Sequence, residues 1–209
     1  MNPAGGRKEE SMAQLLMFHD LTHTYEVDGE TLPSVSEIIR FISREVYGSV
    51  TQYTLDNACD RGKKVHKFCE NLDKFGTVDC DEDLAAYVEA YMNFLKDHTV
   101  EWSIIEQSMY HKEQLYAGTI DRVGKVDGKL SIVDIKTSCV IHKPLVTAQI
   151  NAYAEMYEDN NADIIEQLIA LQLKSDGTYK IHEIEIDSTA FTACLTLHGV
   201  LKKKGKVKK

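Results

Sequence analysis

The feature that most constrains this chain is a predicted β-hairpin centred on Asp127 and Gly128. Apolar and β-branched residues flank this dipeptide on both sides, and Asp-Gly tolerates the positive φ angles of a type I′ turn. If the loop has only these two residues, counting back along both strands places Asp121 opposite Asp134. That pair falls at a non-hydrogen-bonded position, where Cα atoms lie about 4.5 Å apart and side chains are closest. Lys136, two residues beyond Asp134, projects from the same face of the sheet.

The opposed carboxylates of Asp121 and Asp134 point to a bound cation. Two such groups repel one another, so a purely structural hairpin gains nothing from them. A divalent cation between them would remove the repulsion, and oxygen ligands suit Mg²⁺ or Mn²⁺. The Lys136 ammonium could then orient or deprotonate a water molecule. A surface hairpin with scattered charges, or a loop of odd length that shifts the register, is the alternative that this pattern leaves open.

The length and composition fit one globular domain with a substantial core. The chain has 209 residues, of which 43% are hydrophobic and 27% charged, as in ordinary soluble proteins. No apolar run is long enough to span a bilayer, and residues 1–10 lack the apolar segment of a signal peptide, so a cytoplasmic protein without a membrane partner is expected. The cysteines form no C-x-x-C pair, so the pattern suggests neither a zinc knuckle nor a disulfide framework and favours free, mostly buried thiols. They are Cys59, Cys69, Cys80, Cys139 and Cys194.

The charge of the chain is unevenly distributed. The net charge is −9, which argues against a broad surface that coats nucleic acid. Six lysines lie in residues 202–209, so removing their +6 from −9 leaves −15 for residues 1–201. A polyanion would therefore have to be bound locally or through the basic tail, although a basic tail is more often a solvated end.

The first hundred residues are predicted to be mostly helical. A second Asp-Gly hairpin is expected within 22–32. Ser34 and Glu37 have the spacing of a capping box and should begin a helix. Two longer helices are expected over 51–74 and 82–98. The apolar residues expected to face the core from the first and last of these helices are Ile38, Ile39, Phe41, Ile42, Leu84, Val88, Tyr91, Met92 and Leu95.

After residue 100 the hydrophobic period changes to two, which indicates strands. A first strand over 101–111 carries Glu106 and precedes the hairpin. A helix over 143–158 follows, and Gln149 and Tyr153 share one of its faces because they are four residues apart. Two strands, 164–173 and 179–186, and a final helix, 188–201, complete the prediction.

No internal repeat or flexible linker interrupts the chain, so residues 1–209 are expected to form a single domain. In this interpretation residues 1–15 are disordered and 16–100 form the mostly helical N-terminal part. Residues 101–187 form the sheet core, and 188–209 form a C-terminal helix with the basic tail.

Four short motifs follow one another within residues 62–153. They are Gly62-Lys63-Lys64-Val65-His66, Gly118-Thr119-Ile120-Asp121, Asp134-Ile135-Lys136-Thr137 and Gln149-Ile150-Asn151-Ala152-Tyr153. Together they resemble the motifs of the RecB-type branch of the PD-(D/E)XK nuclease superfamily, which includes phage exonucleases and CRISPR-associated nucleases. The resemblance implies a fold of the α/β class, with a restriction-endonuclease-like αβββαβ core and a mixed central sheet flanked by helices.

The resemblance also implies a metal site. In this branch a histidine before the sheet, acidic residues and a backbone carbonyl bind Mg²⁺ or Mn²⁺. Here the ligands would be His66, Asp121, Asp134 and the backbone carbonyl of Ile135. Without the resemblance, His66 is more simply interpreted as a half-buried core histidine. No iron–sulfur cluster is expected, because relatives that carry one use three clustered C-terminal cysteines and only Cys194 lies beyond Cys139.

Four further residues would complete an active site of this kind. Lys136 would position or activate the attacking water. Gln149 and Tyr153 would hold the lysine or a substrate phosphate. Glu106 stands where relatives often have a supporting acidic residue, although an exposed carboxylate at a strand edge is the alternative.

The implied function is metal-dependent hydrolysis of DNA phosphodiester bonds by an exonuclease of phage or mobile-element type. DNA is the expected partner, while protein partners in recombination or replication and a homo-oligomeric state stay open. Two alternatives remain, a catalytically idle nucleic-acid- or protein-binding module on the same fold and a restriction-type endonuclease. The presence of Asp121, Asp134 and Lys136 argues against the idle module, because inactive relatives usually lose one of them.

Overall fold

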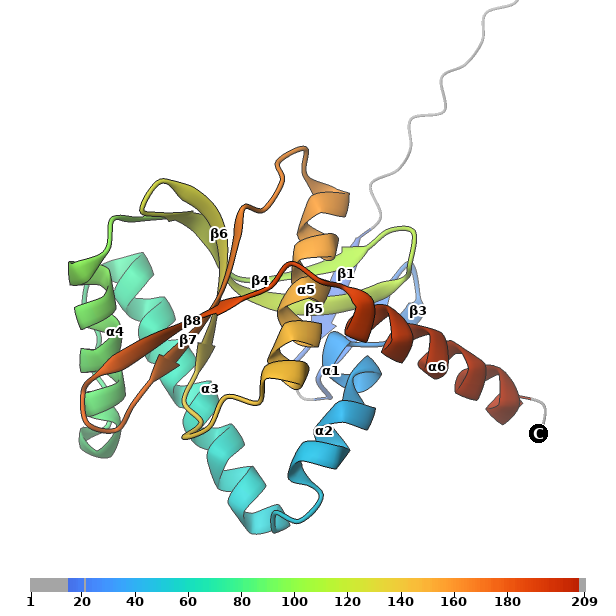
Figure 1. Cartoon of the computed structure of the whole chain (residues 1–209), viewed down its shortest axis with the longest axis horizontal. Helices are drawn as coiled ribbons and strands as arrows, with labels where there is room; N and C mark the ends of the chain where they lie inside the picture. Colours follow the sequence, from blue (N-terminus) through green and yellow to red (C-terminus); the bar gives the residue numbers. More distant parts are fainter. Residues whose placement is uncertain (1–14, 21, 207–209) are drawn as a thin grey trace, which may run out of the picture.

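The computed structural model describes residues 15–20 and 22–206 and contains two β-sheets (Figure 1). The smaller sheet has the strand order β1-β2-β3, with β1 (Leu16–His19), β2 (Thr24–Val27) and β3 (Glu30–Leu32). The larger has the order β4-β5-β6-β7-β8, with β4 (Val100–His111), β5 (Tyr116–Val126), β6 (Lys129–Lys136), β7 (Gln167–Leu173) and β8 (Tyr179–Ile184). The helices are α1 (Val35–Ile38), α2 (Arg40–Tyr47), α3 (Gln52–Phe75), the 3₁₀ helix η1 (Glu82–Leu84), α4 (Ala85–Asp97), α5 (Lys143–Asn160) and α6 (Thr189–Lys206).

The β5–β6 hairpin has the predicted turn and register. Its Asp-Gly turn residues have φ angles of 49° and 85°, as a type I′ turn requires. Strand pairing continues with the predicted partners as far as Arg122 and Val133. Asp121 and Asp134 are the next residues on the two strands, so they emerge at the open end of the hairpin.

The larger sheet is mixed, as expected. Strands β4, β5 and β6 form an antiparallel meander. Helix α5 then carries the chain back, so β7 runs parallel to β6 and β8 returns antiparallel to β7. The observed order of elements therefore agrees with the αβββαβ prediction and with a mixed central sheet flanked by helices.

Different helices cover the two faces of this sheet. Helices α3 and α4 pack on one face, and α1, α5 and α6 pack on the other (Figure 1). Consecutive residues of β6 alternate between the two cores, with Ile132 facing one and Val133 the other, and both are fully buried. Burial on both faces explains why these strands are almost continuously apolar.

The smaller sheet is attached at the start of β5. The Pro33 carbonyl accepts a hydrogen bond from the Ala117 N–H at 3.0 Å, and Ser34 forms a parallel bridge with Ala117. Tyr25 and Val27 pack with Tyr110 and Ala117 in a separate apolar cluster. The predicted hairpin at 22–32 is thus confirmed, and it gains a third strand, β1, that the sequence pattern did not indicate.

Several local predictions were wrong. The first helix breaks at Ile39 into α1 and α2, so the apolar residues on either side no longer share one face, and Phe41 is exposed. Met92 is exposed as well, because consecutive helix residues point in directions about 100° apart and Met92 follows the buried Tyr91. Two cysteines expected to be buried, Cys59 and Cys139, are exposed.

The two ends of the chain lie partly outside the described residues. The segment expected to be disordered lies outside the described residues up to residue 14, as do residues 207–209 of the basic tail. Among the described helices, none combines the length and apolar character needed to cross a bilayer.

Candidate active site

Three elements bring His66, Glu106 and Asp121 together. His66 comes from α3, Glu106 from β4 and Asp121 from β5, and one ligand atom of each lies within 4.8 Å of the others. His66 Nδ1 is 3.3 Å from Glu106 Oε1 and 3.5 Å from Asp121 Oδ1. These three residues are called the acidic cluster below. An imidazole nitrogen with two carboxylates is a donor set that suits Mn²⁺ or Mg²⁺.

Glu106 has an unusual backbone conformation. Its φ is 48°, in the left-handed region that costs a non-glycine residue roughly 1–3 kcal/mol. It lies in the middle of β4, between the strand pairs Ile105–Arg122 and Gln107–Ile120. Strain of this kind persists where the surrounding structure fixes it and concentrates at functional sites.

His66 is held in the tautomer that a metal ligand needs. Its Nε2–H donates a hydrogen bond to the Ile135 carbonyl at 2.9 Å, which leaves Nδ1 facing the two carboxylates. Burial lowers the pKa of His66, but the Asp121 and Glu106 carboxylates more than offset this and raise it to about 9. Below that pH His66 also carries a proton on Nδ1, and the positively charged imidazolium ring lies between these carboxylates.

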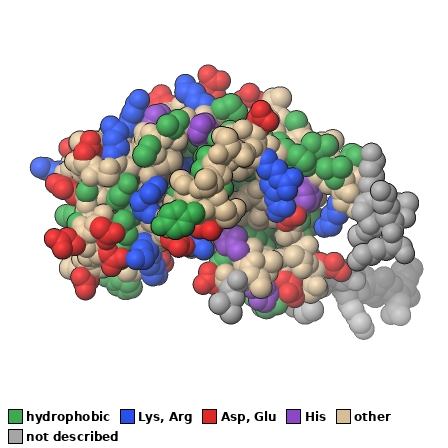
Figure 2. All heavy atoms as spheres, turned by 90° about the horizontal axis from the view of Figure 1, so that it is seen from below, with side chains coloured by type: hydrophobic (Ala, Val, Ile, Leu, Met, Phe, Trp, Pro, Cys, Tyr) green, Lys and Arg blue, Asp and Glu red, His purple; other side chains and the backbone are tan. Residues whose placement is uncertain are grey.

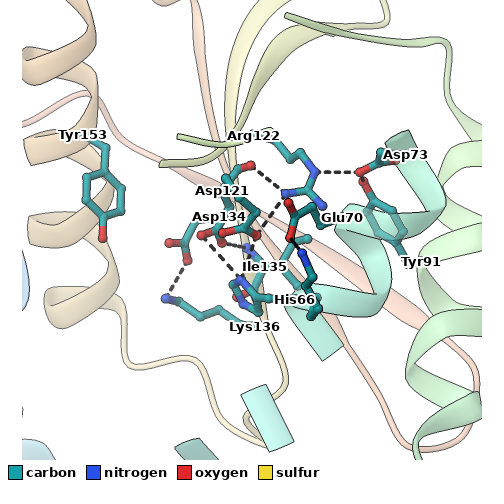
Figure 3. Close-up of polar contacts among 12 residues, drawn as sticks. His66, Glu70, Asp73, Tyr91, Asp121, Arg122, Asp134, Ile135, Lys136 and Tyr153 are labelled. Atoms are coloured by element: carbon teal, nitrogen blue, oxygen red, sulfur yellow. Dashed lines mark hydrogen bonds and ion pairs between the residues drawn. The ribbon is translucent and has the colours of Figure 1, made fainter. Parts of the chain in front are cut away.

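Asp134 lies beside the cluster and is paired with Lys136 (Figure 3). Its Oδ2 is 2.6 Å from Lys136 Nζ, while Asp121 Oδ2 accepts the Ile135 N–H at 2.8 Å. Burial raises the pKa of both carboxyl groups, and the negative charge of Asp121 raises that of Asp134 further. Burial lowers the pKa of Lys136, but the two carboxylates outweigh it and the pKa lies above its usual value. Lys136 is thus a charged ammonium.

The Gln-x-x-x-Tyr motif of α5 reaches this lysine. Gln149 Oε1 accepts a hydrogen bond from Lys136 Nζ at 2.9 Å, and Gln149 Nε2 donates to the Tyr153 hydroxyl at 3.1 Å. A Cβ atom at Gly118 would lie 2.8 Å from the Tyr153 ring, so β5 can approach α5 this closely only with glycine there. The structure therefore joins all four predicted motifs in one site.

A buried ion pair that the sequence pattern does not reveal lies behind the cluster. Arg122 is fully buried and donates from Nε to Asp73 Oδ2 at 2.7 Å and from Nη1 to Glu106 Oε1 at 3.1 Å (Figure 3). The Tyr91 hydroxyl donates to the same Asp73 oxygen at 2.7 Å. These contacts fix Glu106 and dock α3 and α4 on the sheet. An arginine within an apolar strand signals a buried partner, but the sequence does not identify it.

A cleft of about 730 Å³ opens on the acidic cluster. It is lined by α3, by the first two strands of the small sheet and by β4 and β5, which contribute Lys63, Phe18 and Thr119 among others. Clefts of this size accommodate small organic ligands. The cluster is therefore accessible to a substrate, although its side chains are largely buried.

Comparison with known proteins gives distant similarities. No protein-family model and no curated protein matches the chain. A crystal structure described as a "putative exonuclease" from Eubacterium rectale aligns with a TM-score of 0.43 and 15% identity over 67% of this chain and 62% of that one. An alkaline exonuclease from Laribacter hongkongensis aligns with a TM-score of 0.37 and 14% identity over 70% of this chain and 86% of that one. The chain thus spans less than two thirds of the first protein, and at this distance a function can be assigned only from the geometry of the site.

Proposed function

We propose that this chain is a divalent-metal-dependent deoxyribonuclease with an active site of the RecB-type PD-(D/E)XK kind. The observation that carries this proposal is the convergence of His66, Glu106 and Asp121 within 4.8 Å, next to the Asp134–Lys136 pair. Burying several ionisable groups together is unfavourable unless they pair with one another, hold a ligand or serve a reaction. Here two carboxylates face one imidazole, a donor set that fits a bound cation.

The residues present fit a hard or borderline divalent ion. His66 Nδ1 and the carboxylates of Asp121, Asp134 and Glu106 would hold it, and the acidic cluster contains no thiolate that would favour a softer metal. The raised pKa values of Asp121 and Asp134 reflect buried negative charge that a cation would offset. When bound, such an ion supplies Lewis acidity, which lowers the pKa of a water molecule and offsets charge on a phosphate.

The protein's own groups orient the substrate. Lys136 is held by both Asp134 and Gln149, so its ammonium has a fixed position from which it can stabilise negative charge on the scissile phosphate. Its raised pKa favours this role over that of a general base. Tyr153 supports the lysine through Gln149.

The finer assignment of exonuclease rests on the motif resemblance. It implies an enzyme of phage or mobile-element type that degrades DNA from an end. A restriction-type endonuclease would use the same cluster, and an idle binding module would keep the fold without turnover.

One assay separates these possibilities. Purified protein is incubated with end-labelled linear DNA and with covalently closed circular DNA, in Mg²⁺ or Mn²⁺. An exonuclease degrades the linear DNA and leaves the circle intact, and Asp121→Asn abolishes the activity. Asp127→Asn, an identical change in the exposed hairpin turn, serves as the matched control and should retain it. Cutting of the circle indicates an endonuclease, and DNA binding without cleavage under either metal indicates an idle module.

A further inference from the structure

A row of hydroxyl groups extends from the acidic cluster toward the small sheet. Ser108 and Thr119 form the strand pair two residues beyond Glu106 and Asp121, about 7 Å further along the strands. Their hydroxyl oxygens are 2.9 Å apart, and the Tyr25 hydroxyl lies 3.0 Å from that of Thr119. This polar chain leads from the strand positions next to the cluster to an aromatic group made of Phe18 on β1, His23 in the following turn and Tyr25 on β2.

The aromatic group presents exposed rings to the cleft. Tyr25 is 2% exposed, and the Phe18 ring covers it at a centroid distance of 4.8 Å and an interplanar angle of 33°. His23 meets Phe18 edge-on at 5.2 Å. Phe18 and His23 are themselves exposed and line the same cleft as the acidic cluster. Because the two rings are perpendicular, a nucleobase that stacks face-on on one of them meets the other edge-on.

The opposite side of the cleft carries two lysines, Lys63 and Lys67, and one glutamate, Glu70. Lys63 and Lys67 line it from α3, on either side of His66 in sequence, and Lys67 is anchored by Glu70 at 2.8 Å. Ammonium groups on one side and aromatic rings on the other match the backbone and the bases of a nucleic acid strand. A base inside a duplex is already stacked on both faces and cannot occupy such rings, whereas an unpaired base leaves both of its faces free for stacking.

We infer that Phe18 and His23 form a stacking subsite for one unpaired base of a single DNA strand whose phosphate lies at the acidic cluster. Lys63 and Lys67 contact the backbone of the same strand. This inference rests on the proposed function and adds the substrate class, a single-stranded end or overhang. Because every base has a π-face, the subsite tolerates any sequence.

The test measures binding and the contribution of one base at a time. Fluorescence anisotropy is used with short single-stranded oligonucleotides, intact or carrying one abasic nucleotide at successive positions from either end. All variants are made in the Lys136→Ala protein and measured with Mn²⁺, because slow cleavage keeps the oligonucleotides intact during the binding measurement. Phe18→Ala removes the ring, Phe18→Leu keeps apolar packing on Tyr25 without the ring, and thermal melting checks that both variants fold. Phe41→Ala is the matched control, since Phe18 and Phe41 are both 37% exposed and Phe41 lies on α2, outside the residues that line the cleft.

Loss of the ring should weaken single-strand binding about 5- to 150-fold, the range for one base–aromatic stack. In the protein that retains Phe18, an abasic nucleotide at one position should weaken binding by a similar factor. In Phe18→Ala and Phe18→Leu the same abasic nucleotide should have little further effect on the affinity. Phe41→Ala should bind as the parent does. Three results would overturn the subsite. The first is equal affinity of the Phe18 and Phe41 variants for single-stranded DNA, and the second is an abasic nucleotide that weakens binding as much in Phe18→Ala as in the protein with Phe18. The third is binding of a blunt duplex that is as tight as single-strand binding and also depends on Phe18. Failure of the proposed function appears separately, as the absence of cleavage by the unsubstituted protein.

Discussion

The ammonium of Lys136 forms an ion pair with the Asp134 carboxylate and donates a hydrogen bond to the Gln149 amide oxygen. It is outside the proposed metal ligands, so its main effect should appear where negative charge develops on the phosphate. Lys136→Ala should lower single-turnover DNA cleavage by roughly 10²–10³, equivalent to about 3–4 kcal/mol, while calorimetric Mn²⁺ affinity stays nearly unchanged. Lys129→Ala, on the exposed end of the same strand, is the control. An equally active Lys136→Ala protein would assign the lysine to another role.

The proton on His66 competes with a metal ion. Since the pKa of His66 is raised to about 9 by the surrounding carboxylates, the imidazole is protonated at pH 7.5 and must lose its proton to bind an ion. Mn²⁺ affinity should therefore rise about tenfold per pH unit between pH 7 and 9, with release of about one proton per ion, and should exceed Mg²⁺ affinity. His66→Ala should weaken Mn²⁺ binding and remove the proton release, as calorimetry in buffers of different ionisation enthalpy would show. Unchanged Mn²⁺ binding in that variant would make His66 a packing residue.

Among the elements, α3 depends on one buried ion pair for its attachment to the sheet. The Asp73 side chain is 3% exposed and that of Arg122 is fully buried. Removing Arg122 leaves the Asp73 charge without this partner, and removing Asp73 leaves Glu106 as the remaining carboxylate on Arg122. Arg122→Met or Asp73→Asn alone should reduce the free energy of unfolding by about 3–5 kcal/mol, and the double variant should lose less than the sum. Urea unfolding measures this, with the exposed Arg44→Met as control. Additive losses would mean that the pair contributes little as a unit.

The elements also show how far the sequence predicts the site. The β5–β6 hairpin can be predicted with its register because two adjacent turn residues, Asp127 and Gly128, fix it locally. The same holds for the spacing of Gln149 and Tyr153 on α5, which a helix dictates. The carboxylate that joins His66 and Asp121 in the cluster is that of Glu106, which the sequence could place only as a supporting residue.

Other contacts depend on tertiary packing and have no local signal. Arg122 and its partner Asp73 are 49 residues apart in the sequence. They meet because α3 packs across the sheet. The positive φ of Glu106 likewise has no local signal, because nothing about a glutamate in a strand predicts it. Such features require the packed structure.

At the scale of the whole molecule, charge limits how DNA can bind. The net charge is −9, and on the side of the molecule drawn in Figure 2 acidic and basic side chains are interspersed. With Lys63, Lys67 and Lys136 as the phosphate contacts, a plot of log affinity against log salt for single-stranded DNA should have a slope of about −2. Deleting residues 202–209 should leave this slope unchanged. A slope near −4 or steeper that falls on deletion would show that the basic tail binds phosphates.

The backbone at Glu106 has a consequence for attempts to improve this protein. Asparagine adopts a positive φ more readily than glutamate and would place no negative charge against Asp121. Asparagine would also lose the ion pairs of the Glu106 carboxylate with His66 and Arg122, so a laboratory selection for heat resistance weighs backbone strain against these pairs and does not report ion binding. Directed evolution of this chain needs DNA turnover, as well as folding, in its screen.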